Sequence, residues 1–337
     1  MAVIEVEDVR RSFTVRTGNG RWRRDKREVR AVDGLTFSVE EGECVGYIGP
    51  NGAGKSTTVK MLTGILVPSG GRLRVAGVDP AARRAALARR IGVVFGQRTT
   101  LWWDLPLRDS YELARRIYRI PDARYRANLA RCVELLDLGE LLDTPVRQLS
   151  LGQRMRGDLA AALLHDPSVL YLDEPTIGLD VVSKAKVREF LREINRERRT
   201  TVLLTTHDLT DIEQLCGRVM VIDHGRLVLD GPLEQLHAAG ESERTLVVDL
   251  AEARPPIELP GVRVVKVEGP RQWLAFPARQ SAAPLVAAVA ERYPLVDLSV
   301  REPAIEEVIA RIYAGTAAAP AGVRLAAGPG AEPSRGG

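Results

Sequence analysis

The 337-residue sequence predicts an α/β fold built around a mainly parallel sheet. Short apolar runs without alternation recur between longer segments of helical spacing, which is typical of strands covered on both faces. One of these runs continues directly into a glycine-rich loop and a helix. The length corresponds to about two domains at the usual ~150 residues each. Because 45% of the residues are hydrophobic and 27% are charged, a wholly disordered or fibrous chain is excluded.

The strands of this fold follow one another in a regular order. Residues 3–9 and 35–39 alternate as half-buried strands do, and residues 14–30 between them, rich in Gly and Arg, predict an exposed loop or hairpin. The other strands of this domain are predicted at residues 43–48, 91–95, 169–172, 201–204, 219–223 and 226–229.

A helical lobe and a second domain are also predicted. Residues 107–142 have helical spacing and no strand signal, so we place a helical lobe at about residues 98–157 within a first domain of residues 1–238. Strand and helix patterns then predict a small α+β domain over residues 239–315, ending in an amphipathic helix at 305–313. Residues 316–337 are mostly Ala, Gly and Pro and are predicted to be disordered.

Charge is unevenly distributed along the chain. The formal net charge is +4 and the pI is about 9.1, which alone admits a nucleic-acid partner. All of this excess lies in residues 16–30, so the rest of the chain is close to neutral. The cations of this segment are Arg16, Arg21, Arg23, Arg24, Lys26, Arg27 and Arg30. We expect them either to contact anionic lipid headgroups or to be merely solvated.

Cysteine usage and hydropathy indicate the cellular compartment in which the chain is expected. No apolar run reaches the ~18 residues that a membrane-spanning helix needs, and the first ten residues lack the pattern of a secretory signal. Cys44, Cys132 and Cys216 form no CxxC pair, which argues for a reducing compartment and against a disulfide or zinc framework. We therefore expect a cytosolic chain with no spanning segment of its own.

A phosphate-binding loop is predicted at residues 49–56. Its sequence, GPNGAGKS, fits GxxxxGK[ST] and lies between a predicted strand and a predicted helix, which disfavours a simple glycine-rich turn. Backbone N–H groups and the helix dipole would hold a polyphosphate, Lys55 would reach its terminal phosphates, and Ser56 would ligate Mg²⁺. The expected nucleotide-binding residues here are Gly49, Pro50, Asn51, Gly52, Ala53, Gly54, Lys55, Ser56 and Thr57.

Two carboxylates end the apolar run at residues 169–172. Open α/β sheets bind ligands at the carboxyl ends of their strands, so Asp173 and Glu174 are expected in the same crevice as the phosphate loop. Asp173 would hold Mg²⁺, and Glu174 would act as the general base that polarises an attacking water. The alternative is a solvated strand end without function.

Further motifs resemble those of the ATP-binding cassette (ABC) ATPases over about residues 1–238. Residues 149–153, LSLGQ, resemble the signature motif LSGGQ, and residues 175–180 resemble the loop after the catalytic glutamate. Gln97 matches the hinge glutamine, His207 the switch histidine, and Phe13 the aromatic residue that stacks on adenine. The resemblance implies a P-loop NTPase cassette with a parallel-sheet core, an antiparallel β subdomain and an α-helical lobe.

The same resemblance implies ATP hydrolysis with Mg²⁺ and assigns residues to it. Catalysis is assigned to Glu174, His207, Lys55 and Gln97, and metal binding to Ser56, Gln97 and Asp173. Besides the phosphate loop, nucleotide contacts are assigned to Phe13, Ser150, Gly152, Gln153 and Asp180. The family places the signature far from the phosphate loop of its own chain. The resemblance therefore implies a dimer that sandwiches two ATP molecules.

The signature departs from the family pattern at one position. Leu151 replaces the usual first glycine, so we expect Ser150 and Gly152 to contact the phosphate while Leu151 points into the helical lobe. Ser150 also suits the N-cap of a helix over residues 151–164, whose dipole would favour a γ-phosphate.

Three segments, residues 97–106, 149–158 and 173–180, most resemble ATPase subunits of exporters of the drug, sodium-ion and polysaccharide class. This implies a separate integral-membrane permease, a homodimer of ATPase subunits, a place on the cytoplasmic face of the cell membrane and no nucleic-acid partner. Trp102 and Trp103 are either anchors for that permease or core of the helical lobe. The alternative is a soluble ABC ATPase acting on nucleic acid or ribosomes. It is disfavoured because such relatives usually carry paired cassettes, coiled-coil insertions or zinc-binding cysteines.

Overall fold

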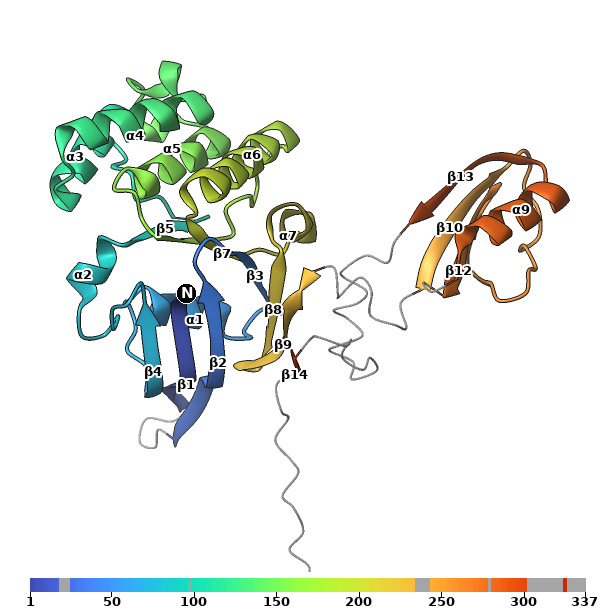
Figure 1. Cartoon of the computed structure of the whole chain (residues 1–337), viewed down its shortest axis with the longest axis horizontal. Helices are drawn as coiled ribbons and strands as arrows, with labels where there is room; N and C mark the ends of the chain where they lie inside the picture. The colour runs from blue at the N-terminus through green and yellow to red at the C-terminus, as the bar shows by residue number, and fades with distance from the viewer. Residues whose placement is uncertain (18–24, 97, 234–242, 278–279, 302–323, 326–337) are drawn as a thin grey trace, which may run out of the picture. The chain divides into compact units, whose positions relative to one another are not determined.

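The computed structural model describes residues 1–17, 25–96, 98–233, 243–277, 280–301 and 324–325. The chain forms two compact units, residues 1–230, to which Leu325 belongs, and residues 231–324 (Figure 1). Gln97 and the expected helix at 305–313 lie outside the described residues, as does most of the expected tail. Within that tail, Arg324–Leu325 form the short strand β14.

A seven-stranded sheet forms the centre of the first unit, in the order β14-β9-β8-β3-β7-β6-β5. Its strands besides β14 are β3 (Cys44–Ile48), β5 (Ile91–Phe95), β6 (Val169–Asp173), β7 (Thr201–Thr205), β8 (Arg218–Asp223) and β9 (Arg226–Pro232). Pairing is parallel from β8 through β3, β7 and β6 to β5. The interiors of these strands are almost wholly buried, as the continuous apolar runs predict. The predicted α/β fold with a parallel sheet is confirmed.

Helices accompany this sheet and build the helical lobe. The first unit contains α1 (Lys55–Leu62), α2 (Arg84–Ala88), α3 (Leu107–Tyr118), α4 (Asp122–Leu135), α5 (Leu151–Leu163), α6 (Val181–Arg198) and α7 (Leu209–Leu215). Helix α5 packs against α3, α4 and α6, and these four gather at one end of the unit (Figure 1). Short 3₁₀ turns at Gly139–Leu141 and Val146–Gln148 connect α4 to α5.

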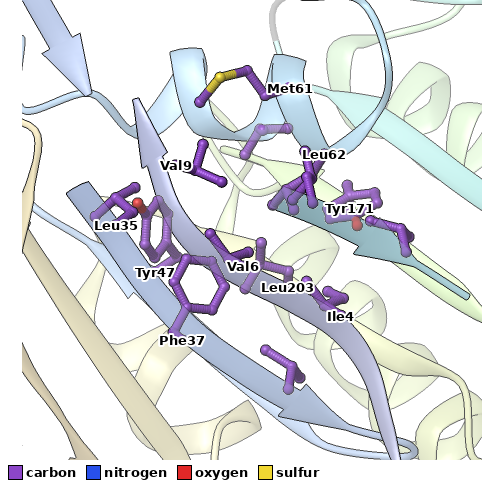
Figure 2. Packing of buried hydrophobic residues seen from close by; sticks show 14 of the residues in the cluster. Ile4, Val6, Val9, Leu35, Phe37, Tyr47, Met61, Leu62, Tyr171 and Leu203 are labelled. Carbon is purple, nitrogen blue, oxygen red and sulfur yellow. The ribbon is translucent and has the colours of Figure 1, made fainter. Parts of the chain in front are cut away.

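An antiparallel sheet in the order β2-β1-β4 completes the first unit. Strands β1 (Ala2–Thr17) and β2 (Asp25–Glu40) pair as a long hairpin, so residues 14–17 and 25–30 are strand rather than loop. Strand β4 (Gly70–Val75) was not anticipated, because its two glycines and exposed arginines hide the alternation of Leu73 and Val75. Side chains of β1 and β2 pack against helix α1, including Met61 and Leu62, and against the parallel sheet (Figure 2). This core fixes the loop between the two sheets.

The second unit is a four-stranded antiparallel sheet with one described helix. Strands β10 (Glu243–Leu250), β11 (Arg263–Glu268), β12 (Arg271–Pro277) and β13 (Leu295–Arg301) lie in the order β11-β12-β10-β13. Helix α9 (Ala282–Arg292) contributes Leu285 and Val289 to a core with Leu246 and Phe276. The described residues of this unit combine strands and a helix, as the α+β prediction for residues 239–315 expects. Across the described ranges of the whole chain, every helix is too short or too polar to cross a membrane.

Candidate functional site

The phosphate loop connects β3 to α1, as predicted. Gly54 caps α1 in the left-handed region with φ 108°, and a Cβ there would lie 2.5 Å from the Ala31 carbonyl oxygen. A Cβ on Gly49 would lie 2.2 Å from the Ile222 carbonyl oxygen. Both positions therefore require glycine, and the loop is held against β8 by this close approach.

Lys55 spans the loop with its own side chain. Its Nζ donates hydrogen bonds to the carbonyl oxygens of Gly49 and, at 3.1 Å, Pro50. The side chain is buried, and this burial lowers the pKa of Lys55, while the charges of Glu174 and Asp173 act in the opposite direction. The ammonium group is thus held in the mouth of the loop, where a polyphosphate would meet it.

A cleft of about 720 Å³ opens above the phosphate loop. It brings together predicted residues from three separate segments of the sequence, because each follows a strand of the same parallel sheet. The predicted residues that line it are Pro50, Asn51, Gly52, Gly54, Lys55, Ser56, Thr57, Asp173, Glu174 and His207. Ala31, Arg98 and Ile177 also line it, and they were not anticipated.

The side chains of Glu174 and His207 lie next to each other in this cleft. Oε1 of Glu174 lies 3.0 Å from Nε2 of His207. The Glu174 backbone adopts φ 58° and donates its N–H to the Thr205 carbonyl at 2.8 Å. Burial raises the pKa of Glu174; the charges of Asp173 and Asp211 add to this rise, whereas His207 and Lys55 oppose it. A carboxylate in this setting is a stronger base than one on the open surface.

Asp173 and Ser56 provide the oxygen atoms that suit a magnesium ion. Oδ1 of Asp173 accepts a hydrogen bond from Thr205 Oγ1, and the Asp173 carbonyl accepts one from the Gly96 N–H at 2.7 Å. Ser56 lies in the first turn of α1 on the wall of the same cleft. Mg²⁺ is usually held by one or two protein oxygens together with water and substrate phosphates. This set of one carboxylate and one hydroxyl fits that requirement.

The signature residues are not part of this cleft. Ser150 caps α5, with its Oγ accepting from the Gln153 N–H at 3.2 Å and its own N–H donating to Gln153 Oε1 at 2.8 Å. The N-cap prediction for Ser150 is confirmed. Of the described residues that line the cleft, none belongs to the signature.

Asp180 and Phe13 also lie apart from the described lining of the cleft. Asp180 caps α6: its Oδ1 accepts from the Ser183 N–H at 2.9 Å and its Oδ2 from Ser183 Oγ at 2.7 Å. The hydrogen bond from the Ser183 backbone is the main cause that lowers the pKa of Asp180. Phe13 lies on β1, with the Arg11 guanidinium 4.8 Å above its ring centre. The nucleotide contacts assigned to these residues stay predictions.

The expected facing of Leu151 is wrong in detail. Its Cδ2 lies against Gly178, in the loop that follows Glu174, rather than in the interior of the helical lobe. Gly152 is buried, and a Cβ there would lie 2.7 Å from Ser183 Oγ. The physical reason is that the first turn of α5 packs against the start of α6, a contact between segments that the signature alone does not reveal.

We expect Leu151→Gly to keep ATPase turnover within about two-fold of the parent, because the side chain packs against its own chain outside the cleft. Steady-state phosphate release by the purified proteins measures this. Complete loss of turnover would mean that Leu151 takes part in nucleotide binding. Gly152→Ala is the contrasting variant, since its added methyl group would collide with Ser183.

Sequence reasoning missed the role of Thr205. It pairs with Asp173 in the register of β6 and β7 and holds that carboxylate through its hydroxyl group. The residue ends β7, one position beyond the predicted strand and two positions before His207, but its partner depends on strand order and register. A threonine at the carboxyl end of the strand next to that of Asp173 is the signal that could have indicated it.

Comparison with known proteins agrees with this geometry. Residues 32–177 match the profile of the ABC transporter family. A daunorubicin resistance ATP-binding protein, DrrA3, from Streptomyces coeruleorubidus is 36% identical, with 83% of this chain and 90% of the relative covered. The Nod factor export ATP-binding protein I of Paraburkholderia xenovorans is 40% identical, with 71% and 73% covered.

Two solved structures are similar to the first unit in fold. An ATP-binding subunit of an ABC transporter aligns with a TM-score of 0.60 and 26% identity over 70% of this chain and 92% of that one. A dimeric ATP-binding cassette bound to ADP and Pi in a post-hydrolysis state aligns with a TM-score of 0.59 and 25% identity, covering 68% and 98%. Because DrrA3 is 36% identical over 90% of its own length and 83% of this chain, the chain belongs to the ABC transporter family, as one of its ATP-hydrolysing subunits.

Proposed function

We propose that two copies of this chain enclose two ATP molecules and that their hydrolysis drives a separate membrane permease, which exports a drug-like or ionic substrate. The observation that carries the proposal is the Glu174–His207 pair in the cleft of Lys55, since this arrangement supplies a base beside a phosphate site. The relatives named for daunorubicin resistance and for Nod factor export support export.

The residues of the cleft have separate roles in ATP hydrolysis. The phosphate loop and Lys55 bind and orient the terminal phosphates. A carboxylate oxygen of Glu174 accepts the proton of the attacking water, and His207 Nε2 holds the other oxygen in place. Ser56 and Asp173 would hold Mg²⁺, which neutralises charge on the phosphate oxygens when bound.

The position of the signature supports a dimer. Ser150 and its helix lie outside the cleft of their own chain, so a second copy is needed to bring the signature to the phosphates. Val181 and Val182, directly after Asp180, are 83% and 66% exposed, an unusual position for two adjacent valines in a lone subunit. The similar cassette bound to ADP and Pi is dimeric, which supports a dimer of this chain.

A groove beside the helical lobe is the proposed docking site of the permease. Trp102 and Trp103 are 56% and 50% exposed, so the alternative that they form the core of the lobe is wrong. Trp102 borders a groove of about 310 Å³ whose wall includes Phe95, Leu113 and Ile117. Exposed aromatic residues next to an apolar groove suit the anchoring of a partner helix. Docking there would place the subunit on the cytoplasmic face of the membrane.

The basic segment of residues 16–30 has few described side chains. Of its seven cations, only Arg27 and Arg30 have described side chains, and Arg30 lies 3.9 Å from Asp33. Contact with anionic lipid therefore remains a prediction. A role on nucleic acid or ribosomes is not favoured, because the similar proteins are named for resistance and export.

Purification of the tagged chain from membranes tests the proposal. We expect a polytopic membrane protein to co-purify, and we expect Trp102→Ala to reduce its recovery at least several-fold because the anchor is lost. Val265→Ala is the matched control, since Val265 is 55% exposed but lies in the second unit. Thermal unfolding of both variants checks their fold. Recovery of ribosomes or DNA instead of a membrane protein would overturn the transporter proposal.

A further inference from the structure

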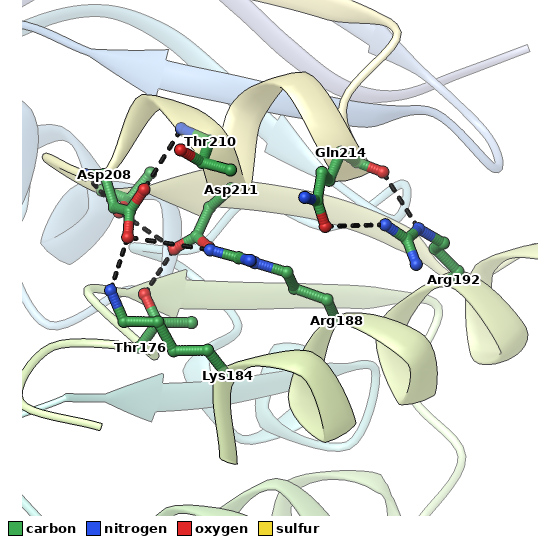
Figure 3. A network of polar contacts seen from close by, with 9 residues as sticks. Thr176, Lys184, Arg188, Arg192, Asp208, Thr210, Asp211 and Gln214 are labelled. Atoms are coloured by element: carbon green, nitrogen blue, oxygen red, sulfur yellow. Dashed lines mark hydrogen bonds and ion pairs between the residues drawn. The ribbon is translucent and has the colours of Figure 1, made fainter. Parts of the chain in front are cut away.

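We propose that Arg188 and Asp211 are positioning residues for ATP hydrolysis: their buried ion pair fixes the loops of Glu174 and His207 relative to each other without touching the nucleotide (Figure 3). This inference rests on the proposed roles of Glu174 and His207. It adds to them two residues that lie outside the described lining of the cleft and outside every motif recognised in the sequence.

Asp211 is the centre of the network. It lies in the first turn of α7 and is fully buried. Its Oδ1 accepts a hydrogen bond from Arg188 Nε at 2.6 Å and lies 2.5 Å from Arg188 Nη2, so two nitrogens of this α6 side chain meet one carboxylate oxygen. Its Oδ2 accepts from the hydroxyl groups of Thr176 and, at 3.4 Å, Thr206. A buried carboxylate with three partner residues is strongly tied to its surroundings, and removing its charge takes away the nearest counter-ion of Arg188.

The two threonines connect Asp211 to the catalytic pair. Thr176 follows Glu174 by two residues and is 2% exposed, and Thr206 directly precedes His207 and is 3% exposed. Thr206 Oγ1 also accepts the Asp208 N–H at 3.0 Å, so the backbone on both sides of His207 is held. Because both loops donate to the same carboxylate, the position of Asp211 sets how far apart Glu174 and His207 lie.

Helix α6 provides the cations of this network. Lys184 and Arg188 are one helical turn apart, and Lys184 Nζ pairs with Asp208 Oδ2 at 2.5 Å. Arg188 Nη2 lies 3.7 Å from the same Asp208 oxygen. The first turns of α6 therefore hold both the residue after His207 and the buried Asp211.

The next turn of α6 provides a matched control. Arg192 also joins α6 to α7, with Nε donating to the Gln214 carbonyl and Nη2 to Gln214 Oε1, both at 3.0 Å (Figure 3). This contact links the same two helices, but neither residue bonds to the loops of Glu174 or His207 in the hydrogen bonds of the described chain. If these contacts only hold α6 and α7 together, loss of Arg192 should affect turnover as much as loss of Arg188. If Arg188 and Asp211 position the catalytic loops, only their loss should lower turnover.

Steady-state kinetics of the full-length chain test the proposal. We expect Asp211→Asn to lower kcat about 10- to 100-fold, because small displacements of catalytic groups cost this much, with KM for ATP within about two-fold of the parent. Arg188→Lys keeps the charge but cannot place two nitrogens on the same oxygen, so its kcat should lie between those of the parent and Arg188→Ala. Arg192→Ala should keep parental kcat. Equal losses in Arg192→Ala and Arg188→Ala would overturn the proposal.

Thr176→Val provides a second route if Asp211→Asn does not fold, as judged by thermal unfolding. It removes the hydroxyl donor while keeping the shape of the side chain, and we expect a smaller fall in kcat with unchanged KM. Parental kcat in a folded Thr176→Val, together with parental kcat in Arg188→Lys, would contradict the proposed role.

A double-mutant cycle with His207→Ala separates this inference from the function on which it rests. If Asp211 acts through His207, the variant carrying both His207→Ala and Asp211→Asn should turn over ATP like His207→Ala alone. If the double variant instead loses turnover by the product of the two single losses, the positioning role is overturned and the proposed function stays intact. Parental turnover in His207→Ala would instead overturn the assignment of His207, and the inference with it.

Discussion

Replacing Lys55 with alanine should abolish ATP binding and turnover. The side chain has two roles, because its Nζ holds the carbonyl oxygens of Gly49 and Pro50 and also supplies the positive charge at the mouth of the loop. Truncation removes both the charge that meets the terminal phosphates and the contacts that keep the loop open. We expect affinity for ATP to fall at least 100-fold, or about 2.7 kcal/mol, measured by titration calorimetry.

Lys186→Ala is the control for this experiment. Lys186 is exposed on α6, pairs with Asp137 at 2.7 Å and does not line the cleft, so its loss should leave ATP affinity within about two-fold of the parent. Circular dichroism of both variants establishes that they are folded. Parental ATP affinity in folded Lys55→Ala would remove the assignment of residues 49–56 as the nucleotide-binding loop.

The phosphate loop and the carboxylates beside it could be predicted from sequence because their chemistry is local. The loop is one contiguous segment whose glycines, lysine and serine have fixed spacing, and Asp173 and Glu174 directly end an apolar strand. Once the strands are taken as parallel, their carboxyl ends must meet at one edge. The convergence of Lys55, Glu174 and His207 follows from that geometry.

Contacts between distant segments could not be predicted in the same way. The pair of Arg188 and Asp211 joins two helices, and its members are 23 residues apart in a stretch rich in other charges. The hydrogen bond of Thr205 to Asp173 depends on the register of β6 and β7. The facing of Leu151 depends on how α5 meets the start of α6. Each of these is decided by packing, which periodicity and motif spacing do not encode.

Strand β4 was missed for a different reason. Its glycines and arginines follow from its place at the edge of the antiparallel sheet, where only Leu73 and Val75 face the core. Two apolar residues give too short an alternation for a strand to be recognised from sequence alone.

Replacing Glu174 with glutamine should stop turnover while leaving ATP bound. The amide cannot accept the proton of the attacking water, so we expect kcat to fall at least 100-fold, within the range known for loss of a general base. Glutamine keeps the shape of the side chain beside His207 Nε2, and Lys55 and the phosphate loop are unchanged, so ATP affinity should be kept. Binding without hydrolysis should then accumulate the ATP-bound dimer.

Size-exclusion chromatography with light scattering in ATP and Mg²⁺ measures this accumulation, and the eluted protein is assayed for retained nucleotide. Glu193→Gln is the control, because Glu193 is a partly exposed carboxylate on α6 that pairs with Arg131 at 3.4 Å, away from the cleft. That variant should hydrolyse ATP at the parental rate and elute like the parent. If Glu174→Gln also hydrolyses at the parental rate, Glu174 is not the general base, and the proton must pass to another group of the cleft.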